Sequence, residues 1–294
     1  MSDTTPEQAR AALESLLQER LAGGPAADWL SEQDPARSLD DLRPELGSVA
    51  RALGRKGLIA SFAARAGASV ASVWGAVPVG SWSVADAARV LLVARAAELE
   101  DDAFAALFRA YDAADTEGRV ACLRALNFTR PGDPERGLEL VRDAGRTYLP
   151  ELLGGAWSGN PFSAQHLSDH DYRKAVLKAF FCDVPVEGFL RLEERADAEL
   201  AKSLCEYVDE RLAAGRTVPR AIWPLAALHP RPGLVARLIG MLEHPDREER
   251  LVAVKALGKA RDPRATSFLS ERREREDDAE VRAALDAALN TLES

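Results

Sequence analysis

Two histidines stand four residues apart near the middle of the chain, His166 and His170, and they are half of the four histidines in the sequence. Histidines at this spacing on one helix can share a metal ion. A helix is expected to begin between them, however, and the sequence has neither a Glu-x-x-His motif nor a C-x-x-C pair. We therefore predict solvated histidines at a helix start, with no metal and no cofactor, and keep His166 as a candidate general acid or base.

Lys178 lies on a partly apolar helix, where two roles are open to it. A buried, uncharged amine would suit base or Schiff-base chemistry, whereas a lysine that extends its stem along apolar surface towards solvent is more common. Arg89 and Arg195 are candidates for holding a carboxylate or phosphate, although an ion pair within the protein is the more common arrangement. No Gly-x-Ser-x-Gly motif and no phosphate-binding glycine loop occurs, so nucleophilic and nucleotide-driven chemistry are not expected.

The element that would position these side chains is a helix that begins at Ser168, where Ser168 and Asp171 have the form of a capping box. Before it, Asn160-Pro161 requires an extended or turned backbone, because proline disfavours helical geometry in the preceding residue. Asp171 is spaced to pair with Lys174 or Lys178 on the polar face. An apolar stripe on the opposite face should be buried; it contains Tyr172, Ala175, Val176, Ala179 and Phe180.

A second helix is predicted to begin after Asp197 and to end at Gly215. Its apolar positions recur at helical spacing, and polar residues line its other side. We expect a pocket where the stretch 160–181 meets this helix.

Composition limits the class of protein. The net charge of -9 argues against a general nucleic-acid or anionic-membrane binder, which needs a dense lysine and arginine surface. The three cysteines are scattered, which fits a reducing, cytoplasmic setting. The first residues are polar and acidic, and no run approaches eighteen apolar residues, so neither a signal peptide nor direct membrane insertion is expected. A membrane-protein partner remains open.

An internal repeat indicates the architecture. Residues 115–126 match residues 246–257 in register, with Asp first, Arg four positions later and Ala-Leu at the end; a third copy begins at Asp278. The pattern resembles HEAT-like repeats, in which the Asp caps a helix and the Arg is expected to bond the turn of the neighbouring repeat. The match at 115 covers a single helix. We predict an all-α, α-solenoid-like array of helical hairpins, with a helical domain at 1–230 and a HEAT-like extension at 231–294 packed continuously on it.

The chain also resembles the EboA-domain family over roughly residues 40 to 225. The residues that carry the resemblance are Val49–Lys56, Trp82 with Asp86–Leu92, Asn160-Pro161-Phe162 with Ala164 and Leu167, Val176–Phe181, Leu192–Ala196, Tyr207, Glu210-Arg211 and Ala214–Arg216. The resemblance implies a link to the export or processing of secondary-metabolite precursors, because members of the family are encoded in gene clusters with a prenyltransferase-like membrane protein. The predicted ligand-binding residues are Arg89, Asn160, Tyr172, Arg195, Tyr207, Glu210 and Arg211, and the catalytic candidates are His166 and Lys178.

The sequence departs from the family pattern at two places. The family's Trp-Asn-Gln is replaced by Tyr172-Arg173-Lys174, and an asparagine usual after Arg146-Thr147 is replaced by Tyr148. If those amides contact a ligand in relatives, this chain has a different ligand or none.

Three functions follow as alternatives. The first is a soluble accessory protein of a secondary-metabolite biosynthesis or precursor-export pathway, which binds a small organic intermediate or a pathway protein. The second is an enzyme acting on that intermediate, with His166 as acid or base and Lys178 or Arg195 as the anchor for an anionic group. The third is a protein-interaction scaffold that docks partners through the HEAT-like extension.

Overall fold

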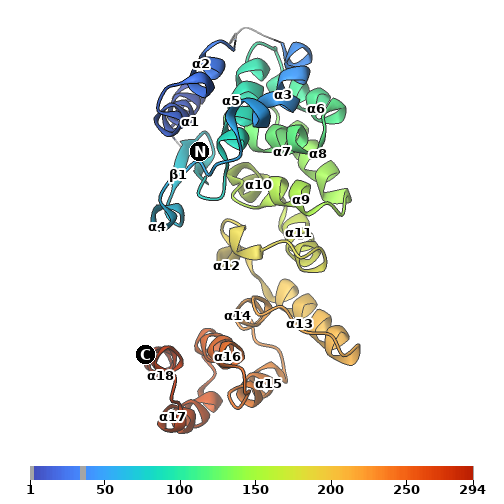
Figure 1. Ribbon diagram of the computed structural model, residues 1–294. Helices are drawn as coiled ribbons and strands as arrows, with labels where there is room; N and C mark the ends of the chain where they lie inside the picture. Colours follow the sequence, from blue (N-terminus) through green and yellow to red (C-terminus); the bar gives the residue numbers. More distant parts are fainter. Residues whose placement is uncertain (1–2, 34–37, 294) are drawn as a thin grey trace. The chain divides into compact units, whose positions relative to one another are not determined.

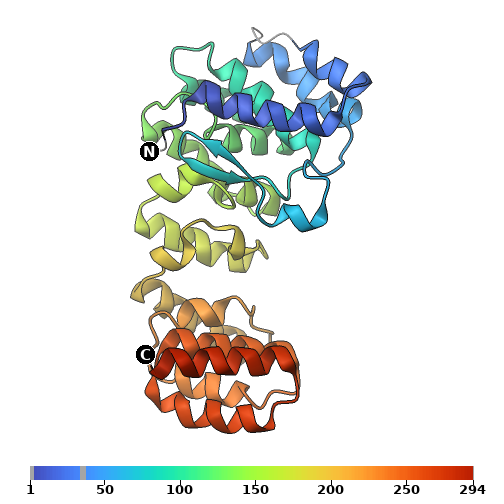
Figure 2. The same ribbon diagram turned by 90° about the vertical axis from the view of Figure 1, so that its left-hand side faces the viewer.

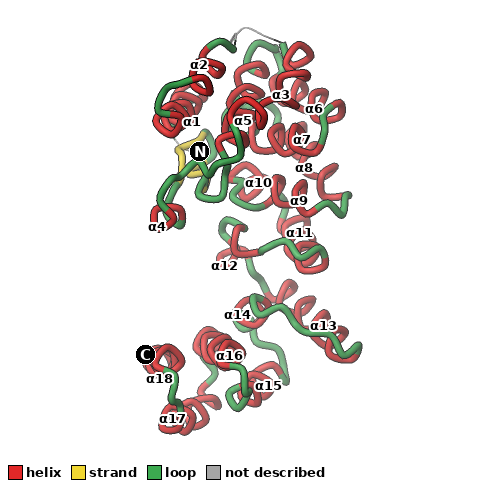
Figure 3. Tube along the Cα trace, in the orientation of Figure 1, coloured by secondary structure: helices red, strands yellow, loops and turns green. Residues whose placement is uncertain are grey.

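The computed structural model describes residues 3–33 and 38–293. It is helical apart from one two-stranded hairpin, which confirms the all-α prediction (Figure 3). Residues up to 190 and residues from 191 onward form two compact units, which are described separately. Within the described ranges, no helix combines the length and the apolar character needed to cross a membrane.

Within its described residues, the first unit has eleven α-helices, two strands and one short 3-10 helix. They are α1 (Pro6–Leu21), α2 (Pro25–Ser31), α3 (Leu39–Leu53), α4 (Phe62–Arg65), β1 (Ser69–Ser72), β2 (Gly75–Pro78), α5 (Val84–Ala97), α6 (Ala103–Ala113), α7 (Thr116–Ala125), α8 (Pro134–Arg146), α9 (Pro150–Trp157), α10 (Pro161–His166), α11 (Asp169–Phe181) and η1 (Val186–Gly188) (Figure 1).

The second unit consists of α12 (Leu192–Arg195), α13 (Ala198–Ala213), α14 (Ile222–Ala226), α15 (Leu234–Met241), α16 (Arg247–Ala260), η2 (Pro263–Ala265), α17 (Thr266–Arg275) and α18 (Ala279–Glu293).

Helix starts follow from short polar side chains that accept hydrogen bonds from otherwise unpaired backbone amides. Ser168 caps α11 and Asp197 caps α13, so these two predicted starts are confirmed. Thr5 caps α1, which has proline in its first turn. Asn160 has extended backbone geometry and caps α10, a short helix that was not predicted. The stretch 160–181 is therefore two helices joined at Leu167 and Ser168.

The core of the first unit is built around α5, in which only Asp86 and Arg95 are not fully buried. Helices α1, α3, α6 and α7 pack on it. Beyond α5 the helices form two layers. In one layer α7 packs on α5 and α9 packs on α7, and in the other α8 packs on α6. The layers place α8, α9, α10 and α11 together at the end of the unit formed by its last residues (Figure 1).

The hairpin of β1 and β2 was not predicted. Its strands are only four residues long, and they pair antiparallel from Ser69 opposite Pro78 to Ser72 opposite Gly75. Contacts distant in sequence hold it: the amide of Val73 donates to the carbonyl of Asn127 at 3.1 Å, and the Trp74 indole donates to the carbonyl of Leu126 at 3.0 Å. The hairpin also packs on α1 (Figure 2). Strand periodicity over so few residues is too short to detect in the sequence.

The second unit is a row of helix pairs, α13 with α14, α15 with α16, and α17 with α18. The second helices of the pairs are neighbours, because α14 packs on α16 and α16 packs on α18 (Figure 2). Each pair thus buries its apolar face against the next, as the HEAT-like pattern predicts.

The repeated Asp and Arg play the same structural part in all three copies. Asp115, Asp246 and Asp278 each cap the helix that follows. The arginine four positions later donates to carbonyl oxygens of the turn before its own helix: Arg119 to Ala114 at 3.1 Å, Arg250 to His244 and Pro245 at 3.0 Å, and Arg282 to Glu276 at 3.1 Å. The prediction that the arginine bonds the neighbouring repeat is therefore wrong for Arg119 and Arg282. Only Arg250 also reaches the next repeat.

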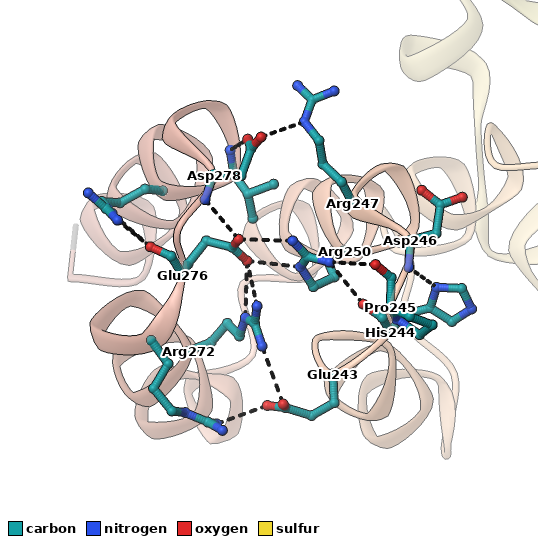
Figure 4. Close-up of polar contacts among 12 residues, drawn as sticks. Glu243, His244, Pro245, Asp246, Arg247, Arg250, Arg272, Glu276 and Asp278 are labelled. Carbon is teal, nitrogen blue, oxygen red and sulfur yellow. Dashed lines mark hydrogen bonds and ion pairs between the residues drawn. The ribbon is translucent and has the colours of Figure 1, made fainter.

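Arg250 reaches the next repeat through the carboxylate of Glu276, which lies in the turn between α17 and α18 (Figure 4). Both Glu276 oxygens accept from Arg250 at 2.9 Å, and one also accepts from Arg272 at 2.8 Å. The Glu276 residue is only 2% exposed. Hydrogen bonds from Arg250, followed by those from Arg272, lower its pKa from 4.5 to about 2 against the opposing effect of burial. The cluster joins α16, α17 and α18.

Candidate functional site

Asn160 lies inside the first unit with 1% of its surface exposed. Its amide group donates to the carbonyls of Leu123 and Gly155, and its oxygen accepts from the Asn127 side chain at 3.0 Å and the Ser163 amide at 3.3 Å. These four bonds use the full capacity of the side-chain amide for two donors and two acceptors. Asn160 thus ties the ends of α7 and α9 to the start of α10.

His166 packs between two aromatic rings, with centroid distances of 4.6 Å to Trp74 and 4.7 Å to Phe162. Its Nε2 atom is buried and has no hydrogen-bond partner in the described part of the chain. Burial lowers the pKa of the imidazole and so favours its neutral form. Among residues 3–33 and 38–293, no group of three His, Cys, Asp or Glu side chains is arranged to hold a metal ion.

A cavity of about 810 Å³ lies among α8, α9 and α11 of the first unit. Its lining is mainly apolar, with Trp157 from α9 and Phe181 from α11 among the larger side chains. The other lining residues are Val141, Arg142, Gly145, Arg146, Tyr148, Leu167, Asp171, Lys174, Ala175, Leu177 and Lys178. Two of its aromatic residues, Phe181 and Tyr148, are 61% and 79% exposed. Such exposure of large aromatic surface at a cavity is typical of a binding site.

Four cations line this cavity, and two of them are neutralised within the protein. Arg142 pairs with Glu135 at 2.8 Å and lies 3.6 Å from Asp171, and Arg146 pairs with Asp143 at 3.1 Å. The two lysines differ from the arginines because neither has a carboxylate partner among residues 3–33 and 38–293.

Lys178 Nζ donates to the backbone carbonyl of Gly145 at 2.6 Å and lies 4.4 Å from the centroid of the Tyr148 ring. Lys174, one turn earlier on α11, is exposed and makes no hydrogen bond or ion pair with any residue of the described ranges. Residues four apart lie on the same face of a helix, so both ammonium groups are on one side of the cavity. The cavity therefore combines an apolar wall with two lysines that form no ion pair with any carboxylate of the described residues.

The family model described as metabolite traffic protein EboA matches residues 26–227, about two thirds of the chain. The chain belongs to the EboA family. A model of HEAT repeats matches residues 217–290, in agreement with the repeat found in the sequence. No curated protein and no solved structure matches the chain.

In this EboA-family chain, Lys174 of α11 and Tyr148, which lies between α8 and α9, both line the cavity. This convergence could not be seen in the sequence, where the two positions are separated by α9 and α10.

The remaining predicted residues of the first unit serve its core. Arg89, which is 2% exposed, donates to the carbonyl of Leu46 at 3.0 Å and forms an ion pair with Glu117. Tyr172 is buried, and its hydroxyl donates to the carbonyl of Leu190 at 2.8 Å. Lys178 is the one predicted site residue of this EboA domain that lines the cavity.

The other four predicted residues belong to the second unit, so the two halves of the predicted pocket lie in different units. Arg195 ends α12. Tyr207, Glu210 and Arg211 are on α13, where Arg211 donates to the Tyr207 hydroxyl at 2.9 Å and to the carbonyl of Thr217. Glu210 is exposed. These contacts close the C-terminal end of α13.

Proposed function

We propose that this EboA-family protein is an accessory protein of a secondary-metabolite pathway that binds a small organic anion with an apolar or aromatic body in the cavity of α8, α9 and α11. The single observation that carries the proposal is the pair Lys174 and Lys178, two cations beside an apolar wall that have no carboxylate partner in the part of the chain that the structure describes. The family description as a metabolite traffic protein supports a ligand that is carried or presented.

The size and lining of the cavity support a ligand of metabolite size. Its volume of about 810 Å³ is within the range of roughly 300–1,000 Å³ that is common for small-molecule sites. A ligand that covers Tyr148 and Phe181 would remove apolar surface from water, which contributes about 25 cal/mol per Å². The apolar body is therefore expected to supply most of the affinity.

The lysines would supply the selectivity for charge. An anion near Lys174 and Lys178 gains two attractive contacts without breaking an existing ion pair, because neither lysine has a carboxylate partner within the described residues. The arginines of the same cavity already have such partners. Aromatic contact with Tyr148 holds the Lys178 ammonium in place beside the cavity.

The geometry supports binding more than acid–base catalysis. The catalytic role proposed for His166 needs its imidazole in reach of the ligand, yet the residue does not line the cavity, and its ring is held between Trp74 and Phe162. His166 is expected to act in packing.

Two fluorescent probes that differ by one charged group test the proposal. 1-Anilinonaphthalene-8-sulfonate (ANS) is an amphipathic anion, and N-phenyl-1-naphthylamine (NPN) is its neutral counterpart. We expect the variant Lys174→Gln/Lys178→Gln to bind ANS about tenfold more weakly than the wild type and to bind NPN unchanged, because two charge contacts of up to about 1 kcal/mol each are lost. Fluorescence titration measures both dissociation constants.

The matched control is Lys56→Gln/Lys202→Gln, which changes two exposed lysines that do not line the cavity. It changes the net charge equally and should leave ANS binding to the cavity intact. An equal loss of ANS affinity in both double variants would contradict the proposal, since it would show that the net charge of the protein, rather than the cavity, determines ANS binding.

A further inference from the structure

Helices α14, α16 and α18 of the second unit line a groove of about 510 Å³. Its floor is made of small side chains, Gly258, Ala284, Ala287 and Ala288. Gly258 permits the close approach of α16 and α18, because a Cβ atom at this position would lie 3.3 Å from the Cβ of Ala288. Pro224, Leu228, Val254 and Thr291 complete the uncharged part of the lining.

All charged residues that line the groove are cations, namely Lys255, Lys259 and Arg261. Lys255 and Arg261 are exposed and make no side-chain hydrogen bond or ion pair with a residue that the structure describes. Lys259 pairs with Glu193, which is itself 63% exposed at its side chain. The charge of the groove lining is therefore positive, whereas the chain as a whole has a net charge of -9.

Lys255 and Arg261, which have no ion-pair partner among the described residues, contrast with the arginines in the turns of the same unit. Arg220, Arg247, Arg250 and Arg272 all form ion pairs with carboxylates there. The unit is rich in acidic residues that neutralise arginine, yet none of them lines the groove. The positive charge of the groove is therefore open to an external anion.

Lysine is also rare in the chain, with six residues against 32 arginines, and four of the six line the two cavities as pairs with i,i+4 spacing. Side chains at this spacing lie about 5–6 Å apart on a helix. In an extended chain, residues i and i+2 lie on one face about 7 Å apart, at a rise of about 3.3 Å per residue. Two acidic residues separated by one residue thus match Lys255 and Lys259.

We propose that the groove of α14, α16 and α18 binds an extended acidic segment of a partner protein, with carboxylates at alternate positions and small or apolar residues beside them. The proposal goes beyond metabolite binding and concerns a different unit. Charge complementarity indicates an acidic occupant, because the groove lining has cations and no carboxylate. The small residues of the floor leave room for a peptide backbone. A protein with a net charge of -9 disfavours a nucleic acid as the occupant.

The test uses the full chain and a fluorescein-labelled peptide of alternating glutamate and alanine, followed by fluorescence anisotropy. We expect Lys255→Glu/Arg261→Glu to weaken binding at least about tenfold, because attraction is replaced by repulsion at two exposed positions. Ala287→Trp, which fills the floor without changing charge, should weaken binding as well. A peptide with glutamine in place of glutamate should bind far more weakly.

The matched control is Arg216→Glu/Arg231→Glu, two exposed cations of the same unit that do not line the groove. Unchanged peptide binding by this control supports the proposal. Equal loss in both reversals would overturn it by showing a bulk charge effect. Tighter binding of an oligothymidylate than of the acidic peptide, lost in Lys255→Glu/Arg261→Glu, would overturn it in favour of a nucleic-acid surface.

Discussion

Replacing Asn160 with alanine is expected to lower the free energy of unfolding of the first unit by about 3–4 kcal/mol. The change leaves two backbone carbonyls, one side-chain amide and one backbone amide without the partner that Asn160 supplies. Each buried polar group left unpaired costs about 1–3 kcal/mol, and partial relaxation keeps the total below the sum. Urea denaturation followed by tryptophan fluorescence measures the change, since four of the five tryptophans are in this unit.

Asp133→Ala is the matched control. Asp133 also caps a helix and also precedes a proline, but it is exposed and accepts only one backbone amide. Its loss should cost about 1 kcal/mol. If Asn160→Ala costs no more than Asp133→Ala, the central role assigned to Asn160 in the core is wrong, and a ligand-binding role would regain support.

Replacing Glu276 with glutamine is expected to lower the free energy of unfolding of the second unit by about 3 kcal/mol at pH 7. The variant leaves Arg250 and Arg272 without the carboxylate that neutralises them in a largely buried site. Hydrogen exchange of peptides from α16 and α18 reports this unit directly, because the cluster joins these helices.

The pH dependence of the stability difference between wild type and Glu276→Gln distinguishes the effect of the side-chain charge from the effect of its shape. The pKa of Glu276 is lowered on folding from 4.5 to about 2, so its ionisation stabilises the folded state above pH 4.5. This contribution is lost as the pH falls from about 4.5 towards about 2, and the stabilities of wild type and variant should converge there. Glu274→Gln, an exposed residue two positions earlier, is the control and should change stability by less than about 0.5 kcal/mol at any pH. A pH-independent difference would mean that shape and hydrogen bonding, rather than charge, explain the loss.

Much of the fold could be predicted from local sequence because its helices begin with strong local signals. Asp115, Asp197 and Asp246 all cap helices at the positions predicted from the sequence. The Asp and Arg repeat predicted the helix pairs of the second unit, and the family match over 217–290 agrees. The β1–β2 hairpin was missed because contacts to Asn127 and Leu126, far along the chain, hold its short strands.

The candidate site was only partly predictable. Lys178 was identified from its type and position, but Asn160 and Arg89 were also predicted to bind a ligand, and the structure places both in the core. A single sequence shows that a residue is polar and gives no direct sign of whether its hydrogen bonds are satisfied inside the protein. The cavity itself depends on the packing of α8, α9 and α11, which brings Tyr148 and Lys174 together.

The most direct test of metabolite binding in the first unit uses the small number of lysines. The six lysines can be dimethylated with a ¹³C label, which keeps their charge, and their resonances can be assigned by replacing each with arginine. During titration with ANS, we expect the methyl resonances of Lys174 and Lys178 to shift first and together, while those of Lys56 and Lys202 stay in place. Shifts confined to Lys255 and Lys259, or equal shifts at all six, would contradict an anion-binding cavity in the EboA domain.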